Sequence, residues 1–190
     1  METGSAEHRQ LKLDRPALPS DATFAASLEP RWYAAYTSAN HERHVAERFA
    51  ARGIEHFLPQ YESVRKWKDR KVRLQLPLFP GYVFVHIALL NRLSVQQVPG
   101  VAHLVSFNSA PAEIAEQDLA RIRQFLSQGF RAEPHPFLQA GRKVRVMSGP
   151  LAGMDGIILR RKNRSRLVIS FDLIQRAMAV EVDGVDLAVL

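Results

Sequence analysis

The 190-residue chain contains no cysteine. This absence excludes disulfide bonds, thiolate metal ligands and cysteine nucleophiles, and it favours a reducing cytosol. Long apolar runs are also missing. The longest, such as Tyr82 to Ile87, are far too short to span a bilayer, and the N-terminus lacks the apolar centre of a signal peptide. We therefore expect a cytoplasmic protein with no membrane contact.

Familiar catalytic motifs are lacking as well. His41 and His44 are three residues apart, whereas a zinc-protease helix needs histidines four apart on one face. There is no Gly-x-Ser-x-Gly motif, and the glycines of Gly149-Pro150-Leu151-Ala152-Gly153 precede a predicted strand instead of a helix. We predict that the protein is not an enzyme and has no metal site and no cofactor; an enzyme with an unrecognised site is the alternative.

Positive charge is what the chain has in excess, with a net charge of +7. Much of it falls in two short segments, whose basic residues are Arg65, Lys66, Lys68, Arg70, Lys71 and Arg73, and then Arg160, Arg161, Lys162, Arg164 and Arg166. Such clusters favour a polyanionic partner, although each also suits a solvated hairpin tip.

The first half of the chain predicts a mixed α and β unit. Residues 1–30 lack a sustained period and are interpreted as a disordered extension. A strand is predicted over 32–37 and a helix over 41–52, ended by Gly53. A long hairpin with its tip at 67–70 follows, then a strand over 82–87, a short helix over 91–97 and a strand over 101–107. Leu119, Ile122 and Leu126 recur at helical spacing. This order favours an antiparallel sheet with helices on one face.

The last third predicts short strands alone. Residues 128–139 contain Gly129, Pro134 and Pro136 and are interpreted as a linker. Strands are predicted over 143–147, 156–160, 167–171, 176–182 and 185–190, with Asp183-Gly184 as a hairpin turn. Five short strands can hide their edges by forming a small barrel. The predicted class is α+β, with units over 31–127 and 140–190.

Two sets of residues resemble the NusG family of transcription elongation factors. Residues 31 to about 127 look like its N-terminal (NGN) domain, which has a ferredoxin or RNP-like fold. The matching positions are Trp32-Tyr33, Glu42, Leu58-Pro59, Leu78-Phe79-Pro80-Gly81-Tyr82-Val83-Phe84-Val85 and Pro99-Gly100-Val101. Residues 140–190 resemble its KOW domain, an SH3-like barrel, at Gly141, Val144, Val146, Gly149-Pro150, Gly153 and Gly156. One KOW motif alone is weakly specific, since ribosomal proteins share it, but the two domains in this order are strongly specific.

The resemblance implies a partner for an aromatic surface. NusG proteins dock an apolar patch of the first domain on the coiled-coil clamp helices of the largest RNA polymerase subunit and oppose pausing. On this chain we assign the patch to Tyr36, Phe79, Pro80, Gly81, Tyr82 and Phe84, and Trp32 is a further candidate. The alternative is that these side chains form sheet core. Tyr82 and Phe84 share one face of a strand and Val83 and Val85 the other, so one set can be core while the other is exposed.

The same resemblance assigns roles to the basic hairpin and to the second domain. Arg65, Lys66, Trp67, Lys68, Arg70 and Lys71 would contact DNA or RNA in the elongation complex. Relatives engage the termination factor Rho or a small-subunit ribosomal protein through a tip similar to Ile-Phe-Gly-Arg. Leu173-Ile174-Gln175-Arg176 stands there in this chain and keeps only the arginine, which argues against Rho and leaves a ribosomal contact open.

Three functional interpretations follow. The tip, the hairpin and the N-terminal extension look more like specialised relatives such as RfaH and the UpxY group, which antiterminate particular operons, often for surface polysaccharides. A housekeeping factor that couples polymerase to Rho or the ribosome is the second. A ribosomal or RNA-binding KOW protein is the third. We expect a monomer. The target operon, and whether the second domain refolds or masks the first, stay open.

Overall fold

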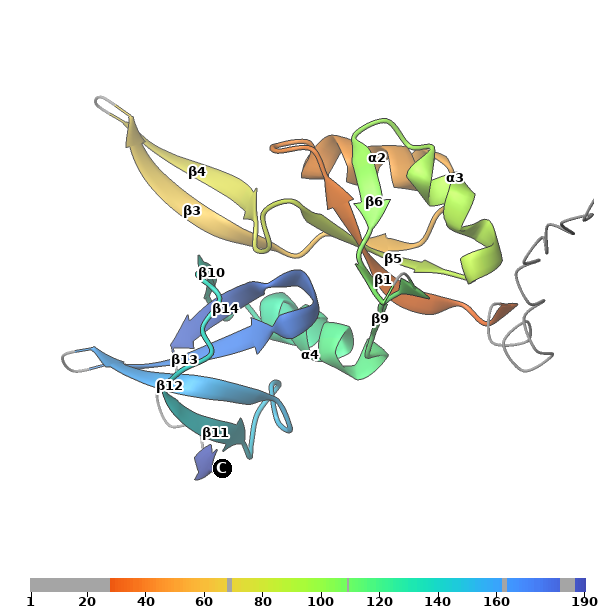
Figure 1. The fold of residues 1–190 in the computed structure, drawn as a ribbon. Helices are drawn as coiled ribbons and strands as arrows, with labels where there is room; N and C mark the ends of the chain where they lie inside the picture. The colour runs from red at the N-terminus through yellow and green to blue at the C-terminus, as the bar shows by residue number, and fades with distance from the viewer. Residues whose placement is uncertain (1–27, 68–69, 109, 162–163, 182–186) are drawn as a thin grey trace, which may run out of the picture.

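The computed structural model describes residues 28–67, 70–108, 110–161, 164–181 and 187–190 (Figure 1). The predicted extension therefore lies, up to residue 27, outside the described part of the chain, as does the predicted Asp183-Gly184 turn. The described residues form an α+β structure, as predicted. No helix among them is long and apolar enough to cross a membrane.

The first part of the chain is organised around one antiparallel sheet. Its strands run in the order β2-β5-β1-β6, and β9 also pairs with β1. Their bounds are β1 Arg31–Thr37, β2 His56–Phe57, β5 Tyr82–Ile87, β6 Val101–Leu104 and β9 Glu113–Ile114. The strand predicted over 101–107 ends at Leu104, and Ser106–Phe107 (β7) instead pairs with Ala110–Pro111 (β8).

One face of this sheet is covered by helix α2 (Glu42–Ala51), the 3-10 turn η1 (Leu89–Asn91) and helix α3 (Arg92–Gln96). Val45 and Phe49 of α2 are fully buried against Tyr33 and Val83. Helix α2 ends as predicted, since Gly53 adopts a left-handed φ of +67° and its N–H bonds the carbonyl of Ala50.

The opposite face carries helix α4 (Glu116–Ser127), so the expectation that the helices share one face is wrong. Leu119, Ile122 and Phe125 of α4 belong to the same buried cluster as Trp32 and Phe84 of the sheet. The reason is that β1 and β5 are apolar on both sides, and a sheet with two apolar faces needs a layer on each.

A long hairpin leaves this sheet at one end (Figure 1). It consists of β3 (Gln60–Trp67) and β4 (Arg70–Pro77), paired from Gln60↔Pro77 to Trp67↔Arg70. Pro77 ends the ladder, and the Leu78 N–H donates to the Pro59 carbonyl at 2.8 Å to close its base. The predicted ribbon is therefore confirmed.

The last third forms a second antiparallel sheet, in the order β10-β14-β13-β12-β11-β15. Its elements are β10 Ala132–His135, β11 Arg142–Val146, β12 Asp155–Arg161, β13 Arg164–Phe171, η2 Asp172–Ile174, β14 Arg176–Glu181 and β15 Leu187–Val189. Five strands follow the prediction, but β10 is a sixth, within the segment interpreted as a linker. As an edge strand, β10 can contain Pro134 because a proline there need not donate to a second neighbour.

The buried side chains of the two sheets make one continuous cluster. Phe79, Phe84 and Leu119 from the first part belong to it together with Leu167, Ile174 and Met178 from the second. Helix α4 lies between the sheets in Figure 1. The second sheet is therefore packed on the face of the first that the sequence analysis assigned to polymerase.

Candidate partner-binding and nucleic-acid surfaces

The turn at Phe79-Pro80-Gly81 is fixed by a buried carboxylate. Glu42 lies in the first turn of α2, is only 5 % exposed, and accepts a 2.7 Å hydrogen bond from the Gly81 N–H through Oε1. Gly81 has a φ of +89°, and a Cβ at this position would lie 3.2 Å from Cε2 of Tyr36. The Gly81 carbonyl accepts a hydrogen bond of 2.8 Å from the Thr37 N–H. Helix α2 and strand β1 together hold the turn in place.

The six residues predicted as the polymerase patch lie around this turn. The rings of Tyr36 and Tyr82 are 5.3 Å apart, and Tyr36 is 37 % exposed. Phe79 and Phe84 meet edge to face at 5.8 Å and are fully buried. Pro80 is exposed and Gly81 half-buried. The residues are therefore brought together, but half of the aromatic surface is covered.

Trp32, the further candidate for the patch, is a core residue. It is buried and stacks on His86 at 5.0 Å between ring centroids. The Arg123 guanidinium of α4 lies 5.5 Å from the Trp32 ring and 4.8 Å from the Phe57 ring. These contacts fasten α4 to the sheet by cation–π attraction.

The cover over the patch comes from the second sheet. Phe171 meets Phe79 edge to face at 5.1 Å. Arg176, the direct cross-strand partner of Phe171, lies 5.6 Å from the Tyr82 ring, and its Nε donates to the Pro80 carbonyl at 3.4 Å. Burial raises the pKa of Tyr82, and the nearby Arg176 charge partly opposes that shift.

The predicted partner tip is part of this contact. Leu173 is half-buried against the shared cluster, Ile174 is buried, and Gln175 is exposed with a left-handed φ of +50°. A cavity of about 210 Å³ separates Phe84 and Ile114 of the first part from Phe171, Leu173 and Ile174. The tip and the aromatic patch therefore cover one another across an imperfectly filled junction.

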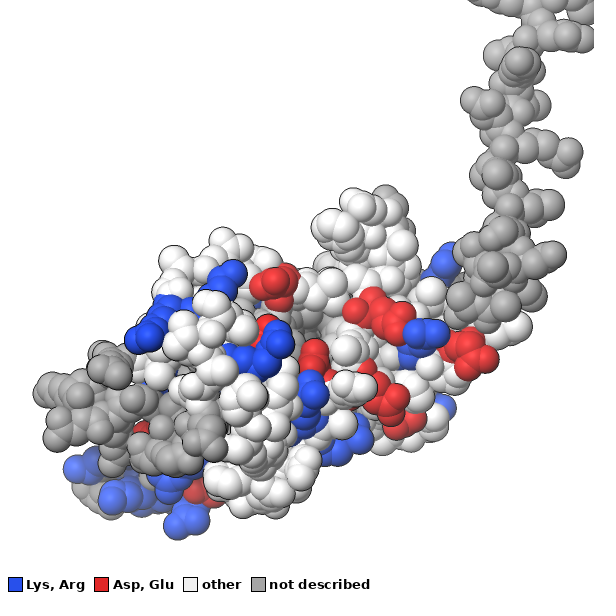
Figure 2. Space-filling view, turned by 90° about the horizontal axis from the view of Figure 1, so that it is seen from below, with Lys and Arg blue, Asp and Glu red and all other residues white. Residues whose placement is uncertain are grey.

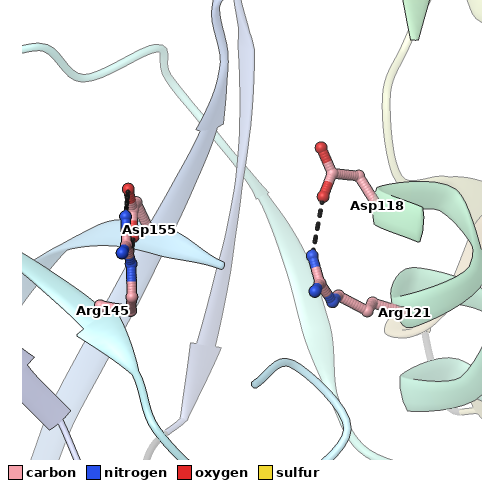
Figure 3. A network of polar contacts seen from close by, with 4 residues as sticks. All are labelled: Asp118, Arg121, Arg145 and Asp155. Carbon is pink, nitrogen blue, oxygen red and sulfur yellow. Dashed lines mark hydrogen bonds and ion pairs between the residues drawn. The ribbon is translucent and has the colours of Figure 1, made fainter. Parts of the chain in front are cut away.

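The glycines of the KOW-like motif shape a loop that faces α4. Gly149 and Gly153 have φ values of +82° and +85° in the left-handed region, beside Pro150. A Cβ on Gly153 would meet Arg121 Nη2 at 2.9 Å, so the α4 side chain rests on this loop. The Arg121 guanidinium is in turn held by an ion pair with Asp118, at 3.1 Å. A second ion pair, between Arg145 and Asp155, joins β11 to β12 (Figure 3). Gly156 is required because a Cβ there would lie 2.8 Å from the Val168 carbonyl.

The basic hairpin exposes its cations as predicted. The side chains of Arg65, Lys66, Arg70, Lys71 and Arg73 are all exposed, whereas the Trp67 side chain and Lys68 lie outside the described residues. Arg73 is 3.7 Å from Glu62, and the other four have no ion pair within the described part of the chain. Figure 2 shows Lys and Arg gathered toward the end of the molecule to which the hairpins β3–β4 and β12–β13 extend in Figure 1. The acidic side chains are more frequent toward the other end.

The histidines of the helix region do not form a ligand set in the described residues. The rings of His41 and His44 are 6.3 Å apart. Across residues 28–190, leaving out the undescribed positions, no group of three or more His, Asp or Glu side chains is arranged to hold a metal ion.

Glu42 holds the turn in place, whereas the sequence analysis gave it only as a position that matches the family. A signal for it exists in the helical spacing, since Glu42, Val45 and Phe49 fall on one face of α2. A buried carboxylate on the apolar face of a helix needs a hydrogen-bond donor, and the Gly81 amide is that donor.

Comparisons with known proteins agree on one family. The model of the family "Transcription termination factor nusG" matches residues 30–123. The NusG termination/antitermination protein of Pseudomonas aeruginosa is 26 % identical over 170 residues, covering 82 % of this chain and 96 % of the relative. Its Escherichia coli K12 counterpart is 28 % identical over 168 residues, covering 80 % and 92 %. The structure "Domain interaction in Thermotoga maritima NusG" has the same fold, with a TM-score of 0.50 at 20 % identity over 82 % of this chain and 94 % of that one. The chain belongs to the NusG family.

Proposed function

We propose that this protein is a cytoplasmic transcription termination/antitermination factor that binds RNA polymerase through the aromatic surface around the Phe79-Pro80-Gly81 turn. The observation that carries the proposal is the construction of that turn. A buried glutamate and a left-handed glycine fix an exposed proline between aromatic rings, where a partner can reach Tyr36 and Pro80. Clustered aromatic side chains of this kind often dominate protein interfaces.

The partner is the pair of coiled-coil clamp helices on the largest polymerase subunit, as the family resemblance implies. The surface of this chain that would receive the clamp helices consists of Tyr36, Phe79, Pro80, Gly81, Tyr82 and Phe84. Phe79 contributes only after Phe171 has left it, and Tyr82 is fully accessible only after Arg176 has moved away. We therefore infer that residues 31–127 and 140–190 are separable domains, and that docking requires the second to move away.

Separation would also free the tip at Leu173, Ile174, Gln175 and Arg176. In the docked state this tip becomes available to the ribosome, while the loss of the aromatic and glycine found in relatives argues against Rho. The basic hairpin would then contact DNA or RNA of the elongation complex through Arg65, Lys66, Trp67, Lys68, Arg70 and Lys71.

Action on particular operons, for example those for surface polysaccharides, is our preferred role, because a covered docking surface suits a factor that is engaged only at chosen sites. The alternative is a housekeeping factor. The retained Arg176, and the coverage of the relatives over nearly their whole length, support that alternative.

The proposal is tested by capture of core RNA polymerase on the immobilised full-length chain. The wild type is compared with a Phe79→Ala/Tyr82→Ala variant and with Phe107→Ala, a control that removes an exposed ring of β7 far from the turn in the sequence. We expect capture by the wild type and the control and its loss in the double variant, with unchanged circular dichroism. Equal capture by all three proteins would refute the assignment of the surface.

A further inference from the structure

Helix α2 contacts the basic hairpin as well as the Phe79-Pro80-Gly81 turn. Arg43, in the first turn of α2, donates a hydrogen bond of 3.0 Å through Nη2 to the backbone carbonyl of Gln75 in β4. The preceding residue, Glu42, is the one that accepts from the Gly81 amide. Two consecutive side chains of one helical turn therefore hold the two surfaces on which the proposed function depends.

The Gln75 carbonyl is free to accept this bond because of the pattern of the β3–β4 ladder. Antiparallel pairs alternate between hydrogen-bonded and non-hydrogen-bonded positions. Pro77, opposite Gln60, has no N–H and stands at a non-bonded position, so Gln75, two residues earlier, stands at one too. Its carbonyl therefore points away from β3, toward the outer edge of the hairpin, and Arg43 covers that edge.

The place of Arg43 in the helix indicates that it serves this contact. The first turn of a helix favours acidic side chains, because the helix dipole places partial positive charge there. Glu42 fits this preference and Arg43 does not, and Arg43 is exposed, so it does not fill the core. The ion pair of the hairpin between Arg73 and Glu62, at 3.7 Å, lies within the hairpin and cannot orient it.

The hairpin magnifies any movement at its base. Strands β3 and β4 have eight residues each, and the hairpin projects from one end of the first sheet (Figure 1). At about 3.4 Å per residue, such a strand is about 27 Å long, so a tilt of about 10° at the base displaces the tip by about 5 Å. Successive phosphates of one DNA strand are about 3.4 Å apart along the helix axis. A hairpin without a fixed direction would therefore reach different nucleotides.

We propose that Arg43 is a positioning residue that sets the direction of the hairpin relative to the aromatic surface. Glu42 fixes the turn that docks on polymerase, Arg43 fixes the hairpin, and α2 joins the two into one rigid frame. Docking then delivers Lys66 and Lys71 to one place on the nucleic acid. The delivery rests on the proposed function, whereas the direction of the hairpin is a property of the protein alone.

The direction is measured in the full-length protein by double electron–electron resonance between two spin labels. Because the chain has no cysteine, Glu47→Cys on α2 and Lys71→Cys near the tip supply the only thiols, both at exposed positions. Arg43→Ala and Arg43→Lys are introduced into this background. Arg52→Ala is the matched control, since exposed Arg52 at the end of the same helix donates to the Ser94 carbonyl at 3.4 Å. Circular dichroism checks that each protein is folded.

We expect one narrow distance distribution for the protein with Arg43 intact and for Arg52→Ala. Arg43→Ala should broaden or shift the distribution by about 5 Å, the tip displacement of a tilt of about 10°. Arg43→Lys should restore part of the narrow distribution, because an ammonium group can also donate to the carbonyl. A distribution for folded Arg43→Ala that matches the one with Arg43 intact would overturn the inference.

The consequence is measured in a reconstituted elongation complex, with an iron chelate attached through Lys71→Cys that cleaves nearby nucleic-acid strands. The other hairpin cations stay in place. We expect cleavage at a few adjacent nucleotides with Arg43 intact and at a wider set with Arg43→Ala, while Arg52→Ala gives the narrow set. Capture of polymerase should be unchanged by Arg43→Ala, because Glu42 and the aromatic surface are intact.

Two results would overturn the positioning role, and they are distinguishable. Equally focused cleavage with Arg43→Ala, in spite of a broadened distance distribution, would mean that the polymerase directs the hairpin. Absence of cleavage with Arg43 intact, in a complex that contains the protein, would refute the proposed contact between hairpin and nucleic acid. The positioning role would then fall with that contact, even where the distances respond to Arg43→Ala.

Discussion

Loosening the junction between the two sheets should strengthen polymerase binding. Phe171→Ala combined with Arg176→Ala removes the two contacts that cover Phe79 and Tyr82, and it leaves every residue of the aromatic surface in place. Both substitutions lie in the second sheet, where Phe171 and Arg176 are directly opposite each other. The closed form is thereby destabilised while the binding surface is untouched.

The size of the effect follows from the two contacts. An edge-to-face aromatic pair contributes about 0.5–1.5 kcal/mol beyond its buried area. A cation–π contact at a partly exposed site contributes about 0.5–1 kcal/mol. Their loss shifts the closed–open equilibrium by about 1–2.5 kcal/mol. When only the open form binds, the apparent affinity rises by the same factor, about 5- to 70-fold, until the open form predominates.

The assay is a titration of the labelled full-length chain with core RNA polymerase. Arg92→Gln/Phe107→Ala serves as the control, since it removes the same two kinds of side chain away from the junction. Circular dichroism and an unfolding curve establish that the double variant is folded. An affinity equal to or lower than that of the wild type, in a folded protein, would show that the second sheet does not restrict access to the aromatic surface.

Three further outcomes are expected. Glu42→Ala should lower the free energy of unfolding by about 1–3 kcal/mol, because the half-buried Gly81 amide loses its acceptor. Glu42→Gln should lower it less, and a urea midpoint equal to wild type for Glu42→Ala would show that Glu42 does not stabilise the turn. Lys66→Gln/Lys71→Gln should flatten the log-log salt dependence of nucleic-acid binding by roughly 0.7–0.9 per lost phosphate contact, and an unchanged slope would leave the hairpin as a solvated turn. Arg145 lowers the pKa of Asp155 below its ordinary 3.8, mainly through their hydrogen bond. This pair stabilises the fold above that value and loses its effect as the pH falls further, so Arg145→Gln should shrink the difference between urea midpoints at neutral and strongly acidic pH.

Local elements could be predicted from the sequence because their signals are local. The helix over 41–52 and the hairpin around residues 67–70 follow from spacing and turn residues, and the structure has them within a residue or two of the expected bounds. The class of the fold follows from the order of such elements. The aromatic residues around Gly81 are also brought together as expected.

The errors concern contacts between segments far apart in the chain. The apolar run from Tyr82 to Ile87 indicates that both faces of the strand are to be buried, but not whether a helix, a second sheet or another protein covers them. Val83, Phe84 and Val85 are all fully buried, so neither face of β5 was left exposed. Strand β10 was missed because Pro134 weakens the strand signal, and only its pairing with β14 at the sheet edge makes it a strand.

The central claim, docking on polymerase through the aromatic surface, is tested most directly by placing a photo-crosslinking phenylalanine analogue at Tyr36 in the full-length chain. Tyr36 is partly exposed in the closed structure, so the analogue need not be buried. The account predicts crosslinks that map to the clamp helices of the largest subunit and are absent when the analogue stands at Phe107. Crosslinks elsewhere on the polymerase, or none in a folded protein that still binds it, would contradict the account.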